Sequence, residues 1–390
     1  MTPRIVSIQT TSERGGAEYA NVDLLEALRR RGHSVLLLTN LPVLAAGTDV
    51  PVETIEIGPK LSLRSVRRVA LDAPRTLWRI ARQLRAARPV GATLVHFKKE
   101  QLLCSMLPRR LTGEVVWCEW GPVPPALRQG LPRLAYALAA RRPREILAVS
   151  EGTAETVRVA GAPPGKVRVL SALVNVHTVG FDPAGRERIR QGWGVGEQTL
   201  VVGCMTRFQR RKRTDVVVDA MAHLGDDVVL VLAGEGEEEQ DLRRRAAPYG
   251  DRVHFIPNVR GDVDAFLSAC DVFVFAPSPT EADRPRAIVM AQQVGLPVIS
   301  THPEGAASLQ APGTGTIASP HHDPQALAQA ISAYRDDPEL RRTVGQSGRA
   351  ALAQWRDPDR VLDEVERALG PGFERGRGEA GSPAAEAGAG

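Results

Sequence analysis

Apolar runs of strand length alternate with amphipathic helical stretches from the start of the chain. Residues 4–8 read as a strand, and an amphipathic helix is predicted at 16–31. Gly32 ends that helix before a second apolar run at 34–38. Strand, helix and strand in this order form a βαβ unit, which predicts a parallel sheet.

The alternation continues and then restarts in the second half of the chain. Further strands of the first half are predicted at 93–97, 114–118 and 146–150. A second series follows, with strands predicted at 200–203, 228–233, 253–255, 272–276 and 297–300. Two series within 390 residues predict an α/β protein of two Rossmann-like domains, at 1–184 and 185–350.

The last part of the chain reads as helical up to residue 369. Helices are predicted at 323–335, where Asp323 caps and Pro324 takes the first position, and at 339–355 and 357–369. Residues 370–390 are mostly Gly, Ala and Glu without periodicity, so a disordered tail is expected there.

Composition argues against several classes of protein. The formal net charge is +5, but aromatic residues make up only 4% and do not interleave with the basic runs, which disfavours nucleic-acid binding. The four cysteines form no C-x-x-C pair, so neither a zinc site nor a disulfide framework is expected. Without a membrane-length apolar run or a signal peptide, we expect a cytoplasmic protein.

Two loops that join a strand to a helix carry residues suited to phosphate. Gly15 and Gly16 stand at a predicted helix start, where free amides and the helix dipole attract anions; a plain tight turn is the alternative. Ala17 breaks the G-x-G-x-x-G pattern of nicotinamide enzymes. The second loop holds Arg207 and the cationic run 210–213, which suit a diphosphate unless the loop is merely solvated.

Glu281 follows a predicted buried strand, at the edge of the sheet where open α/β folds bind ligands. With these motifs in order, the chain resembles the family 4 retaining glycosyltransferases as far as residue 369. The matching segments are the GGAE loop at 15–18, 207–212, LAGEG at 232–236, the strand and loop at 253–259, 269–278, Glu281 and GLPV at 295–298.

The resemblance implies the GT-B fold, with two domains facing each other across a cleft and the helix at 351–369 returning to the N-terminal domain. It also implies roles for individual residues. Those that would contact the donor diphosphate and sugar are Gly15, Gly16, Arg207, Lys212, Glu281, Arg286 and Ala287, with Arg207, Lys212 and Glu281 as the catalytic set. Those on the nucleoside side are Glu235, Val259 and Met290.

Three departures from the family pattern affect this assignment. Met290 stands where the second Glu of the motif normally holds the ribose. The sugar loop at 282–286 is one residue longer than usual and includes Arg286. Trp120 replaces a His that often lines the acceptor cleft, so His96, Lys98 and Glu119 become candidates beside Trp120 on the acceptor side.

The implied function is hexosyl transfer from a nucleotide-diphosphate sugar to an acceptor hydroxyl, with retained configuration and without metal or cofactor. The alternatives are a non-catalytic GT-B protein that binds a nucleotide sugar or partner, and a nucleotide-sugar epimerase or hydrolase. His321, His322 and Asp323 precede a helix and read as its cap rather than as metal ligands. The Arg-rich stretch at 64–88 suits an anionic membrane, but a solvated helix face is favoured.

Overall fold

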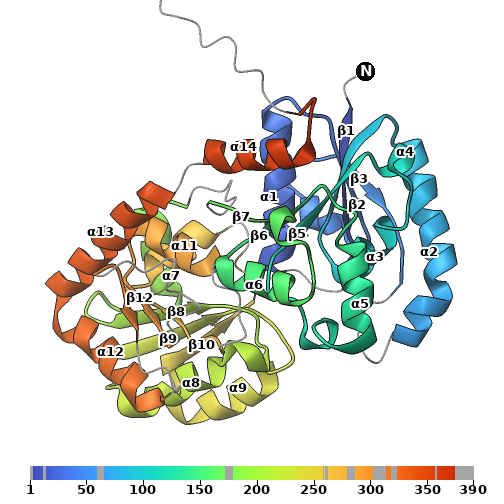
Figure 1. Ribbon diagram of the computed structural model, residues 1–390. Helices are drawn as coiled ribbons and strands as arrows, with labels where there is room; N and C mark the ends of the chain where they lie inside the picture. The colour runs from blue at the N-terminus through green and yellow to red at the C-terminus, as the bar shows by residue number, and fades with distance from the viewer. Residues whose placement is uncertain are drawn as a thin grey trace, which may run out of the picture.

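Two parallel sheets, one in each half of the chain, organise the structure (Figure 1). The computed structural model describes residues 3–11, 15–58, 66–171, 179–257, 259, 262–278, 286–301, 313–317, 323–355 and 358–373. Glu281, Arg284, Pro285, His321 and His322 lie outside these residues.

The N-terminal sheet has the strand order β3-β2-β1-β4-β5-β6-β7, with each neighbouring pair parallel. Its strands are β1 (Arg4–Gln9), β2 (Val35–Thr39), β3 (Val52–Thr54), β4 (Val90–Val95), β5 (Glu114–Glu119), β6 (Glu145–Ala148) and β7 (Val167–Val169). The helices of this half are α1 (Gly16–Arg30), α2 (Val66–Ala86), α3 (Lys98–Cys104), α4 (Arg109–Thr112), α5 (Gly130–Ala139) and α6 (Glu151–Val159).

Alternate residues of β1 supply two separate cores. Val6 and Ile8 pack with residues of α2 to α6 on one face of the sheet. Ile5 packs with α1 on the other face, where α14 (Pro358–Leu369) joins it. Both faces of the central strands are therefore buried, as a parallel sheet requires.

The C-terminal sheet has the order β10-β9-β8-β11-β12-β13 and is also parallel throughout. Its strands are β8 (Leu200–Met205), β9 (Val228–Ala233), β10 (Val253–Ile256), β11 (Val272–Phe275), β12 (Val298–Ser300) and β13 (Thr316–Ile317). The helices are α7 (Pro183–Gly192), α8 (Thr214–Asp219), α9 (Glu239–Ala246), α10 (Val263–Ala269), α11 (Arg286–Val294), α12 (Pro324–Asp336) and α13 (Pro338–Trp355). The predicted α/β fold with two Rossmann-like halves is confirmed.

Each sheet changes the direction of its strand order at one central pair. These pairs are β1 with β4 in the N-terminal sheet and β8 with β11 in the C-terminal sheet. Ligands of open α/β sheets bind beside such a pair, at the carboxyl ends of the strands. The GGAE loop follows β1, His96 follows β4, Arg207 follows β8, and Ser278 lies just beyond β11.

The last helix, α14, leaves the C-terminal half and lies on the N-terminal half (Figure 1). Arg31, at the end of α1, pairs with Asp359 and Asp363 at 2.6 Å each. Val361 and Val365 are buried against the sheet below. The predicted return is confirmed for α14, which begins at Pro358 rather than at residue 351. Leu352, at the expected start of the returning segment, belongs to α13 and packs in the core of the C-terminal half.

The packed chain continues past the expected start of the tail at residue 370. Phe373 is 3% exposed and belongs to the same core cluster as α14. A Cβ on Gly91 would lie 2.6 Å from the Phe373 ring, so the ring fits because residue 91 is Gly. Residues 374–390 lie outside the described part. No helix of the described residues is long and apolar enough to cross a membrane.

Candidate active site

The GGAE loop brings free helix amides to the edge of the N-terminal sheet. Gly15 precedes α1 in an extended conformation, with φ −143° and ψ −177°, and Gly16 is the first helical residue. No side chain caps this helix start. Its first amides therefore keep their capacity to donate hydrogen bonds to an anion.

Arg207 reaches from the C-terminal domain to this loop. A Cβ on Gly15 would stand 1.7 Å from Arg207 Nη2, so only Gly at position 15 admits the guanidinium there. Arg207 Nη2 also donates to Glu18 Oε2 at 3.2 Å. Glu18, on the first turn of α1, is buried and accepts a second hydrogen bond from Thr11 Oγ1 at 2.9 Å. The two predicted phosphate-binding loops therefore meet at one point.

Phe208 anchors the loop that carries Arg207. Its ring is buried in the domain core and meets Phe255 edge to face, with centroids 6.2 Å apart. Its amide donates to the carbonyl of Glu235 at 3.0 Å. A Cβ on Gly236 would lie 2.3 Å from the Phe208 carbonyl oxygen, which explains the small residue in the LAGEG segment.

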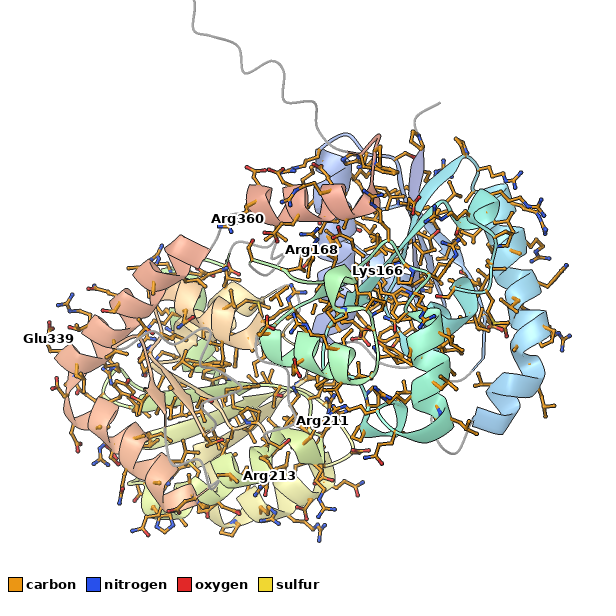
Figure 2. The ribbon with its side chains drawn as sticks, in the orientation of Figure 1. Lys166, Arg168, Arg211, Arg213, Glu339 and Arg360 are labelled. Carbon is orange, nitrogen blue, oxygen red and sulfur yellow. The ribbon has the colours of Figure 1, made fainter. Side chains whose placement is uncertain are left out.

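Lys212 lies at the other end of the same loop. Its Nζ stands 5.6 Å from the centre of the Phe275 ring, at the end of β11. Burial raises the pKa of the Cys204 thiol to about 12, and the nearby positive charge of Lys212 acts in the opposite direction. Arg213, the next residue, pairs with Asp215 at 3.0 Å. Figure 2 shows Arg211 and Arg213 in the C-terminal half.

Arg286 makes a second contact between the domains. It opens α11, directly after the undescribed loop that contains Glu281. Its Nη2 lies 2.5 Å from Asp23 Oδ2, on α1, and Nη1 lies 3.5 Å from the Gly16 carbonyl oxygen. Two arginines of the C-terminal domain thus pair with two buried carboxylates of one N-terminal helix. Ala287, next to Arg286, is half-buried.

The residues predicted on the nucleoside side divide into two groups. Val259 and Met290 are half-buried and pack against the same apolar cluster of the C-terminal domain, as does Ala287. The Glu235 side chain is exposed, and this residue contributes its backbone carbonyl to the Phe208 loop. Val259 and Met290 are therefore both apolar positions, and α11 carries no carboxylate.

Of the residues predicted for the acceptor side, His96 and Trp120 lie together just after β4 and β5. Trp120 Nε1 donates to His96 Nδ1 at 2.9 Å, and His96 Nε2 lies 2.8 Å from Ser7 Oγ. Because the indole N–H can only donate, Nδ1 carries no proton and Nε2–H donates to Ser7. The chain of hydrogen bonds continues from Ser7 Oγ to Asn21 Oδ1 at 3.0 Å. Burial lowers the pKa of His96 to about 3, so the ring is neutral.

Lys98 and Glu119 form a second polar pair nearby. Lys98 Nζ donates to Glu119 Oε2, and the buried Tyr136 hydroxyl donates to Oε1 at 3.1 Å. Burial lowers the pKa of Lys98, and the neighbouring Glu119 carboxylate opposes this. Both oxygens of Glu119 are thus occupied by partners from its own domain.

Several residues of the site were not predicted from sequence. Glu18 and Asp23 pair with the two arginines. Glu100 accepts a hydrogen bond from the Thr10 amide at 3.2 Å. Ser7 is hydrogen-bonded to both His96 and Asn21. A sequence signal existed for Ser7, which is the polar residue within the run IVSI at 5–8. Among the described residues, no group of His, Cys, Asp or Glu is arranged to hold a metal ion.

In comparison with known families, each half of the chain matches a family of glycosyltransferases. Residues 14–178 match the family described as Glycosyltransferase Family 4, and residues 185–351 match Glycosyl transferases group 1.

Curated relatives match over part of their length. The chain is 30% identical over 184 residues to GDP-mannose-dependent monoacylated alpha-(1-6)-phosphatidylinositol monomannoside mannosyltransferase of Corynebacterium glutamicum, which covers 44% of this chain and 48% of the relative. It is 32% identical over 165 residues to the lipopolysaccharide core biosynthesis glycosyltransferase LpsE of Rhizobium meliloti, covering 42% and 47%. The matches span about half the length of these relatives.

Solved structures share the fold over nearly the whole chain. HepE of Anabaena, in complex with UDP and glucose, has a TM-score of 0.78 at 20% identity, covering 94% of this chain and 98% of HepE. Sucrose-phosphate synthase of Thermosynechococcus elongatus has a TM-score of 0.76 at 18% identity, with coverage of 94% and 98%. At these identities the likeness concerns the fold alone.

Proposed function

Because the chain belongs to the family 4-like glycosyltransferases of the GT-B fold, we propose that it moves a sugar from a nucleotide-diphosphate-sugar donor to an acceptor hydroxyl. The observation that carries this proposal is the meeting of Arg207 with Gly15. A guanidinium and a helix N-terminus both bind phosphate, and here they come from opposite domains to one point.

The task of the protein in this reaction is electrostatic. Arg207 and Lys212 would stabilise the negative charge that grows on the departing diphosphate, as preorganised cations do. Glu18 would hold Arg207 in place from behind, since its carboxylate is itself held by Thr11. A donor phosphate would become a further partner of the same guanidinium, on the side of Gly15.

We propose that the reaction retains anomeric configuration, with the acceptor hydroxyl attacking on the face from which the diphosphate departs. A phosphate oxygen of the leaving group would then take the proton, and no protein base is required. The state of His96 supports this, because its pKa is low and both ring nitrogens are already hydrogen-bonded. Its role is to hold Trp120 at the acceptor side.

The positive charge of Arg207 and Lys212 would also take the place of a divalent ion at the diphosphate. We therefore expect transfer to continue in EDTA. Activity that is lost in EDTA and restored by Mg²⁺ or Mn²⁺ would contradict this part of the proposal.

The experiment that tests the function uses the full chain and a panel of donors. UDP-glucose and GDP-mannose are the first choices, because HepE was solved with UDP-glucose and a relative is named for GDP-mannose. Each donor is incubated with and without a panel of polyol and glycolipid acceptors, and products are followed by mass spectrometry. Transfer gives free nucleoside diphosphate and a heavier acceptor. Release of free sugar alone, isomerisation of the donor, or no reaction with any donor would each contradict the proposal.

A further inference from the structure

Large exposed apolar side chains gather on one part of the N-terminal domain. Ten such side chains are exposed in the described residues, and six of them lie on α2, on α5 or on the segment after α3. These six are between 57% and 83% exposed: Leu71, Trp78, Met106, Leu131, Leu134 and Leu138. A concentration of this kind on one surface indicates an interaction site.

The exposed side of α2 combines apolar and cationic residues. Leu71, Arg75, Trp78, Arg82 and Arg85 follow one another at steps of four and three residues, so they form one stripe along the helix. All five are exposed. The opposite side of α2 is already used, because it packs its apolar residues into the domain core.

The exposed side of α5 continues this surface. Leu131, Leu134 and Leu138 lie on one side of the helix by the same spacing, and the exposed Arg141 extends their line. Helix α3 contacts both α2 and α5, and all three cover the same face of the sheet (Figure 1). The outer sides of α2 and α5 therefore point away from the sheet together.

The segments that carry this surface are rich in arginine. Helix α2 carries six arginines and one acidic residue, Asp72. Residues 126–144, which include α5, carry five arginines and no acidic residue. Such a surface attracts a partner that is both anionic and apolar.

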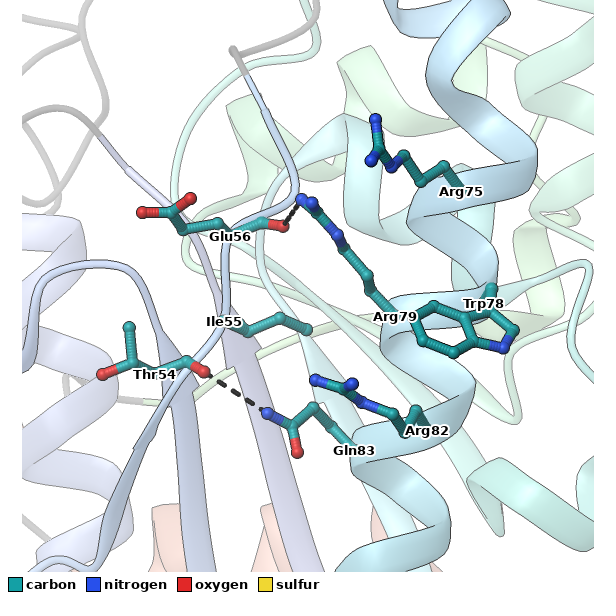
Figure 3. Close-up of a pocket in the computed structure, with 8 residues that line it drawn as sticks. All are labelled: Thr54, Ile55, Glu56, Arg75, Trp78, Arg79, Arg82 and Gln83. Carbon is teal, nitrogen blue, oxygen red and sulfur yellow. Dashed lines mark hydrogen bonds between the residues drawn. The ribbon is translucent and has the colours of Figure 1, made fainter.

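A hollow of about 340 Å³ lies between α2 and residues 54–56 (Figure 3). Arg75, Arg79 and Arg82 line it, and Glu56 borders it. Arg79 Nη1 donates to the Glu56 carbonyl at 2.7 Å, which fixes one wall. The Arg82 guanidinium stands 5.0 Å from the centre of the Trp78 ring. Arginine side chains and an exposed tryptophan thus lie at one place. This combination is typical of sites where proteins bind lipid headgroups.

We propose that the outer side of α2 and α5 docks on an anionic phospholipid bilayer. The arginines contact the headgroups, and Trp78 and the three leucines of α5 enter the layer below them. A second copy of the chain fits this surface less well, because a two-fold contact would bring the two basic stripes together. The proposal does not depend on the transferase activity, since none of these residues belongs to the site described above.

The test is flotation of the full chain with vesicles of phosphatidylcholine alone or mixed with phosphatidylglycerol. Two paired variants remove the two kinds of contact: Arg75→Gln with Arg82→Gln, and Trp78→Ser with Leu134→Ser. Matched controls lie outside α2 and α5: Arg243→Gln with Arg244→Gln on α9, and Phe181→Ser, whose side chain is 53% exposed. All of the substituted side chains are exposed, and melting curves verify that each variant folds.

The wild type should float with the phosphatidylglycerol vesicles only, and salt should weaken the binding because it screens the arginines. Each cation near an anionic surface strengthens binding about fivefold. Loss of the arginine pair should therefore weaken partition of the protein into the vesicles about 30-fold. The apolar pair should weaken it at least about tenfold, and the controls should bind as the wild type does. The proposal is overturned if the wild type does not float, if both paired variants bind as well as the controls, or if the surface proves to hold a dimer that Leu134→Ser dissociates.

Discussion

His96 illustrates how its surroundings limit what a side chain can do. A histidine next to a predicted acceptor site suggests an acid or a base. In the structure it is 3% exposed, accepts from Trp120 and donates to Ser7. Protonation would place a charge in the interior and break the bond from Trp120. These contacts support the proposal that the residue positions Trp120 rather than moving a proton.

The low pKa of His96 predicts a pH dependence of stability. The ring titrates near 6.5 in the unfolded chain and at about 3 in the folded protein. Between these values the unfolded state binds more protons, so stability is lost as pH falls below 6.5. From pH 7 to pH 5 this single group should cost about 2 kcal/mol.

Urea unfolding of the wild type and of His96→Gln, at both pH values, measures that effect. The free energy of unfolding should fall by about 2 kcal/mol more in the wild type than in the variant. Equal losses in the two proteins would show that His96 is protonated as easily in the folded state as in the unfolded state.

Lys212 and Arg207 carry the electrostatic part of the proposed mechanism. Replacing either by Ala should lower kcat/KM for transfer at least about tenfold, because each removes a preorganised cation from the leaving group. The matched control is Arg213→Asn, since Arg213 pairs with Asp215 and Asn tolerates the left-handed φ of 47° at this position. An equal loss of activity in the control would mean that only the net charge of the loop matters.

At the scale of elements, the central strands were predictable and three short edge strands were not. The apolar run at 228–233 coincides with β9, because a strand buried on both faces needs an unbroken series of such residues. β3, β7 and β13 have only two or three residues each, and β3 has exposed positions. Their pairing depends on the neighbouring strand rather than on their own pattern. The predicted strand at 93–97 ends at Val95, and His96 turns into the hydrogen-bond network instead.

The segment after α14 provides a test at the same scale. Phe373→Ala should destabilise the protein by about 3 to 5 kcal/mol, because it empties a well-packed position between Gly91 and His33. The melting temperature should fall by several degrees. Truncation after Phe373 is the control, and it should leave the melting temperature unchanged. If Phe373→Ala and the wild type have the same melting temperature, the Phe373 ring is not packed against the domain in solution.

For the whole molecule, the arrangement of the domains was beyond the reach of sequence patterns. Gly15 and Arg207 were each predictable, because each stands in a local motif between a strand and a helix. Their contact joins residues 192 positions apart, and it depends on how one domain faces the other. The same holds for the pairing of Glu18, the last residue of the GGAE segment, with Arg207. Asp23 looks like an ordinary polar position of α1 until Arg286 of the second domain reaches it.

The central claim is that the donor diphosphate binds where Gly15 and Arg207 meet, and Gly15→Ala tests it most directly. Ala suits the extended backbone of residue 15, but its Cβ would stand 1.7 Å from Arg207 Nη2 and displace the guanidinium. The matched control is Gly165→Ala, where a Cβ meets nothing within 4 Å. The measurement is kcat/KM for the nucleotide-sugar donor, with melting curves for both variants. We predict a fall of at least about tenfold for Gly15→Ala at an unchanged melting temperature, with no effect in the control. Equal kcat/KM values for the two variants would contradict the claim.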